Sequence, residues 1–540
     1  MKKFVVMFAI ITLVFSPVTP GHAVESVFTG ADGEWTTPGS WSNGVPGAGD
    51  DAVINASVQT ISGGSGTASV LSAVFNNNTL WDSAWNGLTL EVGGGAGMAT
   101  FNDNSLNRGK INGNATFNDN SFSSWGTING NATFNDNSRN DVSTINGNAT
   151  FNGSSYDVQS TINGDMYIKS NWWSGVAGAP TGNELVIAAG REWGSAVTGR
   201  VYNSNLIPVE ITQYTFNDGR LHRHGTLNGN VVFNLTDPDV GDQAGTINAG
   251  DTGTVSGNFR TSSGITFLSG TVSSNINGTG GVTKKGAGTV TMSGTSTYTG
   301  LTVLTEGVLS VSMIGDGGVA GNIGQATNAA ENLVLRGGTL RYTGATASTD
   351  RNFTVDDHRQ STIEVTGAAS TLTMSGSSPL TNGSLTKTGA GTLLLSGTHR
   401  YTGGTDVTAG TLRLDGSLAS QTVVQTAGTL SGSGTTRNLT IANGGTLSPG
   451  SGPGTLTTSG DATYAGGGTY TWEINDAGGV KGTNWDLHDI TGDLTITADS
   501  GTPFTIAITS LNGAVAGEAA NFDKYNNLSS ANLIGSVNGF

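Results

Sequence analysis

The 540-residue sequence contains no cysteine, only 11 prolines and few charged side chains, which make up 11% of its residues. Without cysteine there are no disulfides, no thiolate metal ligands and no cysteine nucleophile, so stability must come from packing and backbone hydrogen bonds. Acidic residues outnumber basic ones by 39 to 23, and the formal net charge is -16. Because this charge repels phosphate backbones and anionic lipid, it argues against nucleic acid as a partner.

Glycine is abundant, at 85 residues. That is roughly twice the usual share of about 7%, which argues against a helical protein. Collagen is excluded as well, because the glycines follow no strict triplet and prolines are few. The glycines must therefore serve tight turns between many short strands. A hydrophobic fraction of 35%, with 18 Phe and 10 Trp, still allows a buried core.

The N-terminus has the pattern of a secretory signal peptide. Lys2 and Lys3 precede an apolar run at 4–15, and the small residues Gly21 and Ala23 stand at the positions that a signal peptidase reads. The run of 12 residues is shorter than the roughly 20 needed to span a bilayer. We predict a signal peptide at 1–23, a mature chain that begins at Val24, and no transmembrane segment after it.

Repeats of one short period run through much of the chain. The motif ATFNDNS and its variants place four phenylalanines 16, 17 and 17 residues apart: Phe101, Phe117, Phe134 and Phe151. The companion motif ING advances by 17 residues from Ile111 to Ile162, and the same step separates Phe216 from Phe233. Three downstream leucines keep spacings of 18 and 17: Leu412, Leu430 and Leu447.

This period predicts a β-solenoid in which each repeat forms one coil, because short alternating segments are separated by Asn-Gly and Gly-Gly turns. Ala132 and Phe134 share one face of a strand and Thr133 the other, so the phenylalanines can stack inside. The equivalent turn asparagines can hydrogen-bond along the axis: Asn118, Asn135 and Asn152. We predict an all-β parallel β-helix with about 17–18 residues per coil in the repeat regions. A Greek-key sandwich is the alternative, although it requires no equal spacing.

Two further segments align without a gap at an offset of 103 and share 16 of 29 positions. They are TKKGAGTVTMSGTSTYTGLTVLTEGVLSV at 283–311 and TKTGAGTLLLSGTHRYTGGTDVTAGTLRL at 386–414. The order GAGT, SG, YTG and a turn glycine before a leucine resembles the passenger-associated repeat, also called the autotransporter-associated β-strand repeat. Segments 335–357, 445–457 and 469–496 also resemble sequences that accompany this repeat.

The resemblance implies a right-handed parallel β-helix passenger that is secreted or displayed on a Gram-negative cell surface, with the repeat helping it to fold and leave the cell. It implies no catalytic residues, and we expect no enzyme activity, metal site or cofactor. Autotransporters end in an outer-membrane barrel and related exported proteins in a short sorting segment, but the residues before Phe540 lack the alternation of a barrel strand. We therefore expect a truncated gene or a protein anchored by a partner.

These observations divide the chain into five parts. They are a signal peptide at 1–23, an N-terminal cap-like β segment at 24–98, a Phe/Asn ladder β-solenoid at 99–278, an autotransporter-associated repeat β-solenoid at 279–510 and an irregular tail at 511–540, which a truncated gene would explain.

Two clusters have the residue types of an acid–base site, as in polysaccharide-cleaving β-helix enzymes. The first, in WDLHD, consists of Asp486, His488 and Asp489. Most of that motif follows the family-like pattern, which favours a structural role at a strand edge. The second consists of Asp356, Asp357 and His358. It lies in a polar stretch that is typical of a loop.

Three other groups have the residue types of ligand sites. His222 and His224 are two positions apart, but no third metal ligand stands near them. A possible calcium site, which stays open because its spacing fits neither the EF-hand nor the calcium nonapeptide, consists of Asp237, Asp239 and Asp242. Tryptophans that can stack on sugars are Trp35, Trp41, Trp172 and Trp173. Covering the end of a solenoid is the commoner use of such side chains.

Two classes of function remain. The favoured one is a non-enzymatic surface or extracellular rod that works through structure or adhesion. Its expected partners are cell-surface or extracellular glycans, or an outer-membrane anchoring protein. The alternative is a polysaccharide-active β-helix lyase or hydrolase, which should show non-repeated carboxylates, His or Arg on one face. Long repeats with few charges favour the rod.

Overall fold

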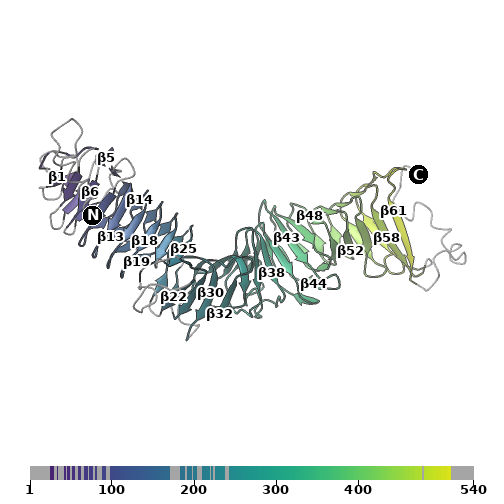
Figure 1. The fold of residues 1–540 in the computed structure, drawn as a ribbon. Helices are drawn as coiled ribbons and strands as arrows, with labels where there is room; N and C mark the ends of the chain where they lie inside the picture. The colour runs from purple at the N-terminus through teal and green to yellow at the C-terminus, as the bar shows by residue number, and fades with distance from the viewer. Residues whose placement is uncertain are drawn as a thin grey trace. The chain divides into compact units, whose positions relative to one another are not determined.

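The computed structural model describes residues 98–168, 243–476 and 479–511, with shorter stretches between 25 and 92 and between 170 and 236. These residues form strands and turns, with one short 3-10 helix at Ala330–Asn332. The strands pair almost throughout in parallel register, as Figure 1 shows. The predicted all-β parallel solenoid is thereby confirmed. None of the helices in the described part of the chain has the length and hydropathy needed to cross a membrane.

The chain forms two compact units, Met1–Ala249 and Gly250–Phe540. The sequence predicts a change of repeat type at residue 279, whereas the compact units of the structure divide after Ala249. The predicted signal peptide at 1–23 and the tail beyond Leu511 lie outside the described residues.

Between Met98 and Ile162, each coil of the first unit contributes one strand to each of three parallel sheets. The first sheet includes β9 (Met98–Phe101), β12 (Asn114–Phe117), β15 (Ala132–Phe134), β18 (Ala149–Phe151) and β21 (Met166–Ile168). The second includes β10 (Leu106–Asn107), β13 (Phe122–Ser124), β16 (Arg139–Asp141) and β19 (Tyr156–Val158). The third includes β11 (Lys110–Asn112), β14 (Thr127–Ile128), β17 (Thr144–Ile145) and β20 (Thr161–Ile162).

Register in this unit places like residues over like. Ala132 and Phe134 are buried and pair with Ala149 and Phe151 of the next coil, while Thr133 faces outward. The rings of the Phe column, Phe101, Phe117, Phe134 and Phe151, stack with successive centroid separations of 4.8, 4.7 and 5.0 Å. The predicted stacking of Phe134 between its neighbours is confirmed.

The turn asparagines Asn118, Asn135 and Asn152 form the predicted Asn column, and Asn102 of the preceding coil extends it. Each Nδ2 donates to the Oδ1 of the preceding coil at 2.7 Å. A second amide column follows the ING motifs, where Asn146 donates to Asn129 at 2.6 Å and Asn163 to Asn146 at 2.7 Å. Identical coils thus satisfy their turn side chains along the axis.

The second unit has columns of leucine in place of phenylalanine. One sheet includes β36 (Thr289–Met292), β38 (Val308–Val311), β40 (Thr339–Tyr342), β43 (Gln360–Val365) and β45 (Ser384–Thr388). Another includes β44 (Thr371–Met374), β46 (Thr392–Leu395), β49 (Gly410–Leu414), β52 (Gly428–Gly432), β55 (Thr446–Pro449) and β58 (Thr469–Ile474).

Coil length varies in this unit. The predicted step of 17–18 residues holds where Leu412 pairs with Leu430 and Leu430 with Leu447. By contrast, Leu309 pairs with Leu340, 31 positions later. The additional residues leave the strand ladder between β38 and β39 (Leu333–Leu335). Equal length is therefore not required for inward-facing residues to stay in register.

Candidate functional site

The aspartate of the WDLHD motif lies inside the second unit. Asp486 is buried, and its two carboxylate oxygens accept hydrogen bonds from the backbone N–H groups of Gly454 and Glu473, both at 2.8 Å. Burial raises the pKa of Asp486 to about 6, although these backbone hydrogen bonds oppose the shift. Its backbone carbonyl accepts the indole N–H of Trp472 at 2.7 Å. The side chain therefore joins three separate segments of the chain.

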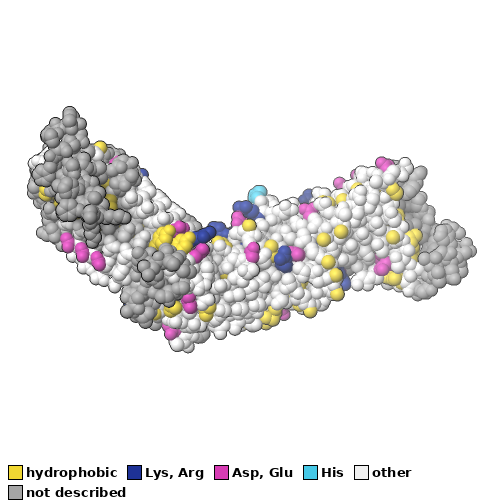
Figure 2. Space-filling view, viewed as in Figure 1, with side chains coloured by type: hydrophobic (Ala, Val, Ile, Leu, Met, Phe, Trp, Pro, Cys, Tyr) yellow, Lys and Arg dark blue, Asp and Glu magenta, His cyan; other side chains and the backbone are white. Residues whose placement is uncertain are grey.

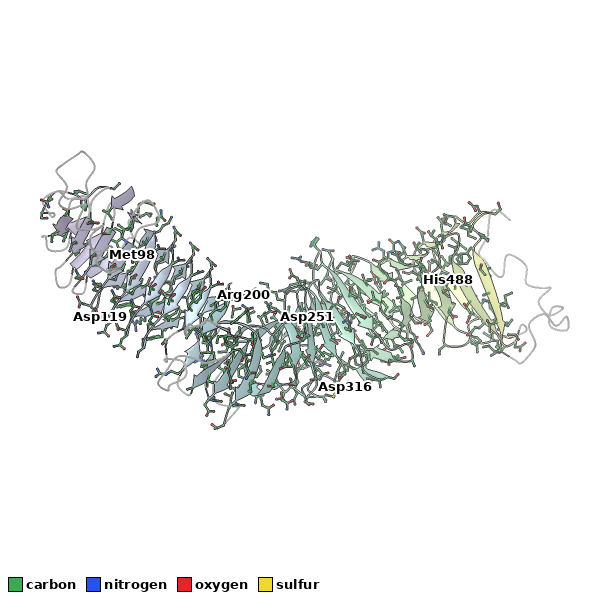
Figure 3. All side chains as sticks on the ribbon, in the orientation of Figure 1. Met98, Asp119, Arg200, Asp251, Asp316 and His488 are labelled. Atoms are coloured by element: carbon green, nitrogen blue, oxygen red, sulfur yellow. The ribbon has the colours of Figure 1, made fainter. Side chains whose placement is uncertain are left out.

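The histidine of the same motif has different partners. His488, labelled in Figure 3, lies on β59 (Leu487–Ile490) and bonds through Nε2 to the hydroxyl of Thr458 at 2.8 Å. Its Nδ1 bonds to the hydroxyl of Tyr464 at 2.6 Å, and burial lowers the pKa of His488 to about 3. Asp489 is exposed. The structure thus gives Asp486 and His488 separate partners instead of one shared acid–base site.

The second predicted cluster lies in a turn between β42 (Thr354–Val355) and β43, as the loop prediction requires. Asp356 accepts a hydrogen bond from Arg336 Nε at 2.6 Å, and Asp357 accepts one from the backbone N–H of Asn382 at 2.6 Å. His358 is exposed at a left-handed φ of 55°. Both carboxylates are therefore engaged in holding neighbouring coils.

Most of the other predicted ligand groups lie outside the described residues. They are His224, Asp237, Asp239, Asp242, Trp35, Trp41, Trp172 and Trp173. His222 is described and is partly buried, and its backbone N–H donates to the carbonyl of Trp193 at 2.8 Å. The open question of calcium binding by the three aspartates therefore stays open.

A serine–histidine pair that sequence reasoning missed lies in the second repeat copy. Ser378 Oγ and His399 Nδ1 are 3.0 Å apart, which is the contact expected between a nucleophile and a base. Both side chains are buried, however, at 3% and 0% exposure, so no substrate reaches the hydroxyl. Burial lowers the pKa of His399 to about 4, and its Nε2 is buried without a hydrogen-bond partner. Alignment of the two repeat copies gives a signal in the sequence. Ser296 of the first copy stands at the position that His399 occupies in the second.

Two buried lysines, also missed, stand at the same position of the two repeat copies. Lys284 Nζ donates to the carbonyls of Lys285, Gly286 and Glu306 at 2.8, 2.6 and 3.1 Å. Lys387 Nζ donates likewise to Thr388, Gly389 and Ala409 at 2.7, 2.9 and 3.0 Å. Burial lowers the pKa of both lysines to about 8. We call the three carbonyls around each lysine its cage. One of them belongs to the first glycine of the GAGT motif, which has a positive φ of 73° at Gly286 and 75° at Gly389. This backbone conformation explains why glycine stands there.

The YTG motif also has a structural explanation in both copies. The hydroxyls of Tyr298 and Thr302 are 2.7 Å apart, and those of Tyr401 and Thr405 are 3.1 Å apart. All four side chains are buried. The repeat signature therefore specifies buried polar contacts that fold a coil, and none of these residues lines an open site.

A buried arginine organises the long loop between β38 and β39. Arg351 is 1% exposed and donates to the carbonyls of Gly315, Val319, Gly324 and Ala326 at 2.8–3.3 Å. Burial lowers its pKa. Asp316 of the same loop, labelled in Figure 3, accepts the backbone N–H of Asp350 at 3.0 Å. One guanidinium thus donates hydrogen bonds to four carbonyls of the loop that leaves the strand ladder.

The surface is poor in charge. Figure 2 shows charged and hydrophobic side chains scattered singly or in small groups on the faces that it presents. A shallow groove of about 620 Å³ in the second unit is lined by Leu418, Arg437 and Asp461 together with small or polar residues. Its lining includes none of the clusters described above.

Comparison with known proteins identifies the repeat. Residues 282–311 and 385–414 match the family described as Passenger-associated-transport-repeat. The chain is 41% identical over 227 residues to the Adhesin BmaC autotransporter of Brucella suis biovar 1 (strain 1330), an alignment that covers 40% of this chain and 6% of the adhesin. It is 46% identical over 97 residues to an Extracellular serine protease of Serratia marcescens, covering 18% of this chain and 9% of the protease.

These matches confirm the resemblance inferred from the repeats: the chain carries two passenger-associated transport repeats and is similar to a segment of an autotransporter adhesin. The chain spans less than a tenth of the length of the curated relatives described above. Their similarity therefore concerns a segment of each relative.

Proposed function

We propose that this protein is an exported, passenger-type component of the bacterial surface or extracellular space, and that it acts as an adhesive or structural β-solenoid without enzyme activity. The observation that carries the proposal is the 41% identity to an autotransporter adhesin over 227 residues, 40% of this chain. Passenger-repeat matches at 282–311 and 385–414 support export to that location.

The outer face of the first unit suits adhesion through many weak contacts. Thr116, Thr133 and Thr150 face outward in consecutive coils and recur at the coil spacing, which is about 4.8 Å. A repeated surface of this kind presents the same groups many times, so modest individual contacts add up to useful avidity. The geometry of the polar clusters agrees with this proposal, because they hold coils together.

The alternative is a polysaccharide-active enzyme, or a hydrolase of the kind that the Serratia relative's name indicates. The Ser378–His399 pair favours a hydrolase by residue type, but the burial of both side chains opposes it. Asp486 and His488 oppose a glycan-cleaving site because each is committed to different partners.

The test uses the purified exported chain on beads, scored for attachment to cells and to glycan-coated surfaces. A variant lacking residues 149–165 removes one 17-residue step and joins Asn148 to Met166 in register. We expect its attachment to fall only in part, since a repeated face loses binding gradually. Cleavage of a polysaccharide or protein that is lost in Asp486→Asn, His488→Gln or Ser378→Ala would overturn the non-enzymatic proposal.

A further inference from the structure

The shallow groove of the second unit follows one corner of the solenoid. At this corner Arg437 and Asn438 connect β53 (Thr435–Thr436) to β54 (Leu439–Ile441), which belong to two different parallel sheets. Residues of four consecutive coils, from Thr402 to Asp461, line the groove. Because coils are about 4.8 Å apart, the groove extends for roughly 14 Å along the axis. We call it the corner groove.

Small residues give the corner groove its depth. The pairing of β53 with the strands on either side of it puts Ala419, Arg437 and Ser459 at one position of consecutive coils. Arg437 is exposed and has shorter side chains on both sides. Gly460 also lines the groove, and a Cβ there would clash with Oδ1 of Asn438. A long guanidinium side chain therefore stands beside a floor of small residues.

Three side chains of the groove have polar groups that the fold leaves without a partner. Asn438 Oδ1 accepts the backbone N–H of Asp461 at 3.1 Å, and Asp461 Oδ1 accepts that of Asp493 at 3.0 Å. Within the described part of the chain, no side-chain hydrogen bond or ion pair involves Asn438 Nδ2, Asp461 Oδ2 or the guanidinium of Arg437. The groove thus offers amide and guanidinium donors beside a carboxylate acceptor.

The charges of the groove cancel. Arg437 and Asp461 are the charged residues of its lining, and just outside it the exposed Arg400 and Asp493 add one charge of each sign. The net charge of -16 on the whole chain repels an acidic polymer but does not act on a neutral one. Leu418 is only 3% exposed, so the lining has no apolar pocket that would anchor a peptide side chain. These features favour a polar ligand without net charge.

We propose that the corner groove binds a linear, neutral oligosaccharide, an inference that rests on the proposed adhesive function. A sugar hydroxyl both donates and accepts, so it can donate to the carboxylate of Asp461 and accept from Asn438 or Arg437. Hydrogen bonds to the two ionised groups are the stronger ones. A groove that follows the axis for roughly 14 Å fits an extended chain of sugars better than a single ring. Many copies on one surface then add weak single contacts into avidity.

The experiment measures equilibrium binding of the whole exported chain to the neutral hexasaccharides of maltose, cellobiose and mannose type. Trigalacturonate and a Gly-Ser peptide are the other probes. We expect a neutral hexasaccharide to bind with a Kd in the millimolar range, because the groove is shallow. Arg437→Gln should weaken binding about tenfold. Asp461→Asn keeps the Oδ1 that accepts from Asp493 and loses the charged acceptor, so it should weaken binding about fivefold.

A third variant tests the shape of the groove separately from its polar groups. Ala419→Gln should fill the floor and weaken binding about tenfold. Its fold should persist, since the next coil carries the long side chain of Arg437 at the same position. Arg359→Gln makes a matched charge change at an exposed residue outside the groove and should leave binding unchanged. Melting temperatures equal to that of the wild type verify that each variant folds.

Equal binding by the wild type and the groove variants, or no binding of any neutral hexasaccharide, would overturn the proposal. Tighter binding of trigalacturonate or of the peptide would overturn it too. The bead attachment assay separates this failure from that of the proposed function. If beads with Arg437→Gln still attach while no hexasaccharide binds, the groove is refuted and the adhesive role stands. If a hexasaccharide binds while wild-type beads attach nowhere, the groove stands and the adhesive role is refuted.

Discussion

The Phe/Asn coils of the first unit and the passenger-repeat coils of the second are held to their neighbouring coils by different interactions. Between Phe117 and Phe151 every coil has one length, so identical rings stack and identical amides hydrogen-bond along the axis. In the second unit coil length changes, and identical residues lie over one another in only some coils, as where Leu412 pairs with Leu430. Buried cations take over there, because Lys284, Lys387 and Arg351 satisfy carbonyls that turn away from the ladder.

From this difference we expect regular coils to distribute stability evenly and irregular coils to concentrate it in a few polar contacts. Loss of one stacked ring affects its neighbours, but loss of one caged lysine leaves three carbonyls without the donor that they share. Removing one partner of a buried polar contact costs more than the contact itself contributes. Substitutions in the two units should therefore fail for different physical reasons.

The largest expected effect is on the Phe column. Phe134→Ala should lower the free energy of unfolding by about 3–5 kcal/mol, because it leaves a cavity between two stacked rings. Thr133→Ala, on the outward face of the same strand, should cost little. Denaturant unfolding, with limited proteolysis near residues 117–151, measures both. Equal losses in the two variants would contradict the face assignment.

The caged lysine gives the next effect. Lys284→Met should destabilise the second unit by about 3 kcal/mol, since three partly buried carbonyls lose their donor while the alkyl packing is kept. Lys285→Met is the matched control, because this neighbouring side chain is exposed and its carbonyl is unchanged. Denaturant unfolding compares the two. If Lys284→Met is as stable as its control, the cage contributes nothing.

Replacing a buried aspartate of the first unit should raise stability instead of lowering it, by an amount that depends on pH. Burial raises the pKa of Asp157 to about 6, although Ser195 and Asn140 donate hydrogen bonds to it. The folded state then favours the protonated form, so stability is greatest below about pH 4 and falls as pH rises to about 6. Asp157→Asn should remove this slope and raise stability at pH 7 by about 2 kcal/mol. Melting temperatures from pH 3.5 to 7.5 test it, and a variant that keeps the wild-type slope would refute it.

The smallest effect concerns acid sensitivity of the second unit. His399 has a pKa lowered to about 4, so its contribution to stability is complete above about pH 6.5 and is lost as pH falls toward 4. His399→Ser introduces the residue of the other repeat copy and should reduce the loss between pH 7 and 5.5 by about 1 kcal/mol. His488 supplies the same kind of slope and remains in place as an internal reference. Unchanged pH dependence of the melting temperature would assign the acid sensitivity elsewhere.

The sequence by itself determined the parallel solenoid, the inward faces, the Phe and Asn columns and the identity of the repeat. These follow from spacing, because columns of like residues form only when the step between them matches the coil. Strand alternation also places Lys284 on the same face of its strand as Val282, and this face is the buried one.

Only the tertiary structure decided which polar side chains are buried and what satisfies them. The carbonyls around Lys284 come from residues up to 22 positions away, Ser378 and His399 are 21 positions apart, and Arg351 reaches carbonyls as far as 36 positions away. Where coils differ in length, the register that brings such groups together is set by packing of the whole coil and not by local pattern. Asp486 and His488 accordingly look like one site in the sequence and have separate partners in the fold.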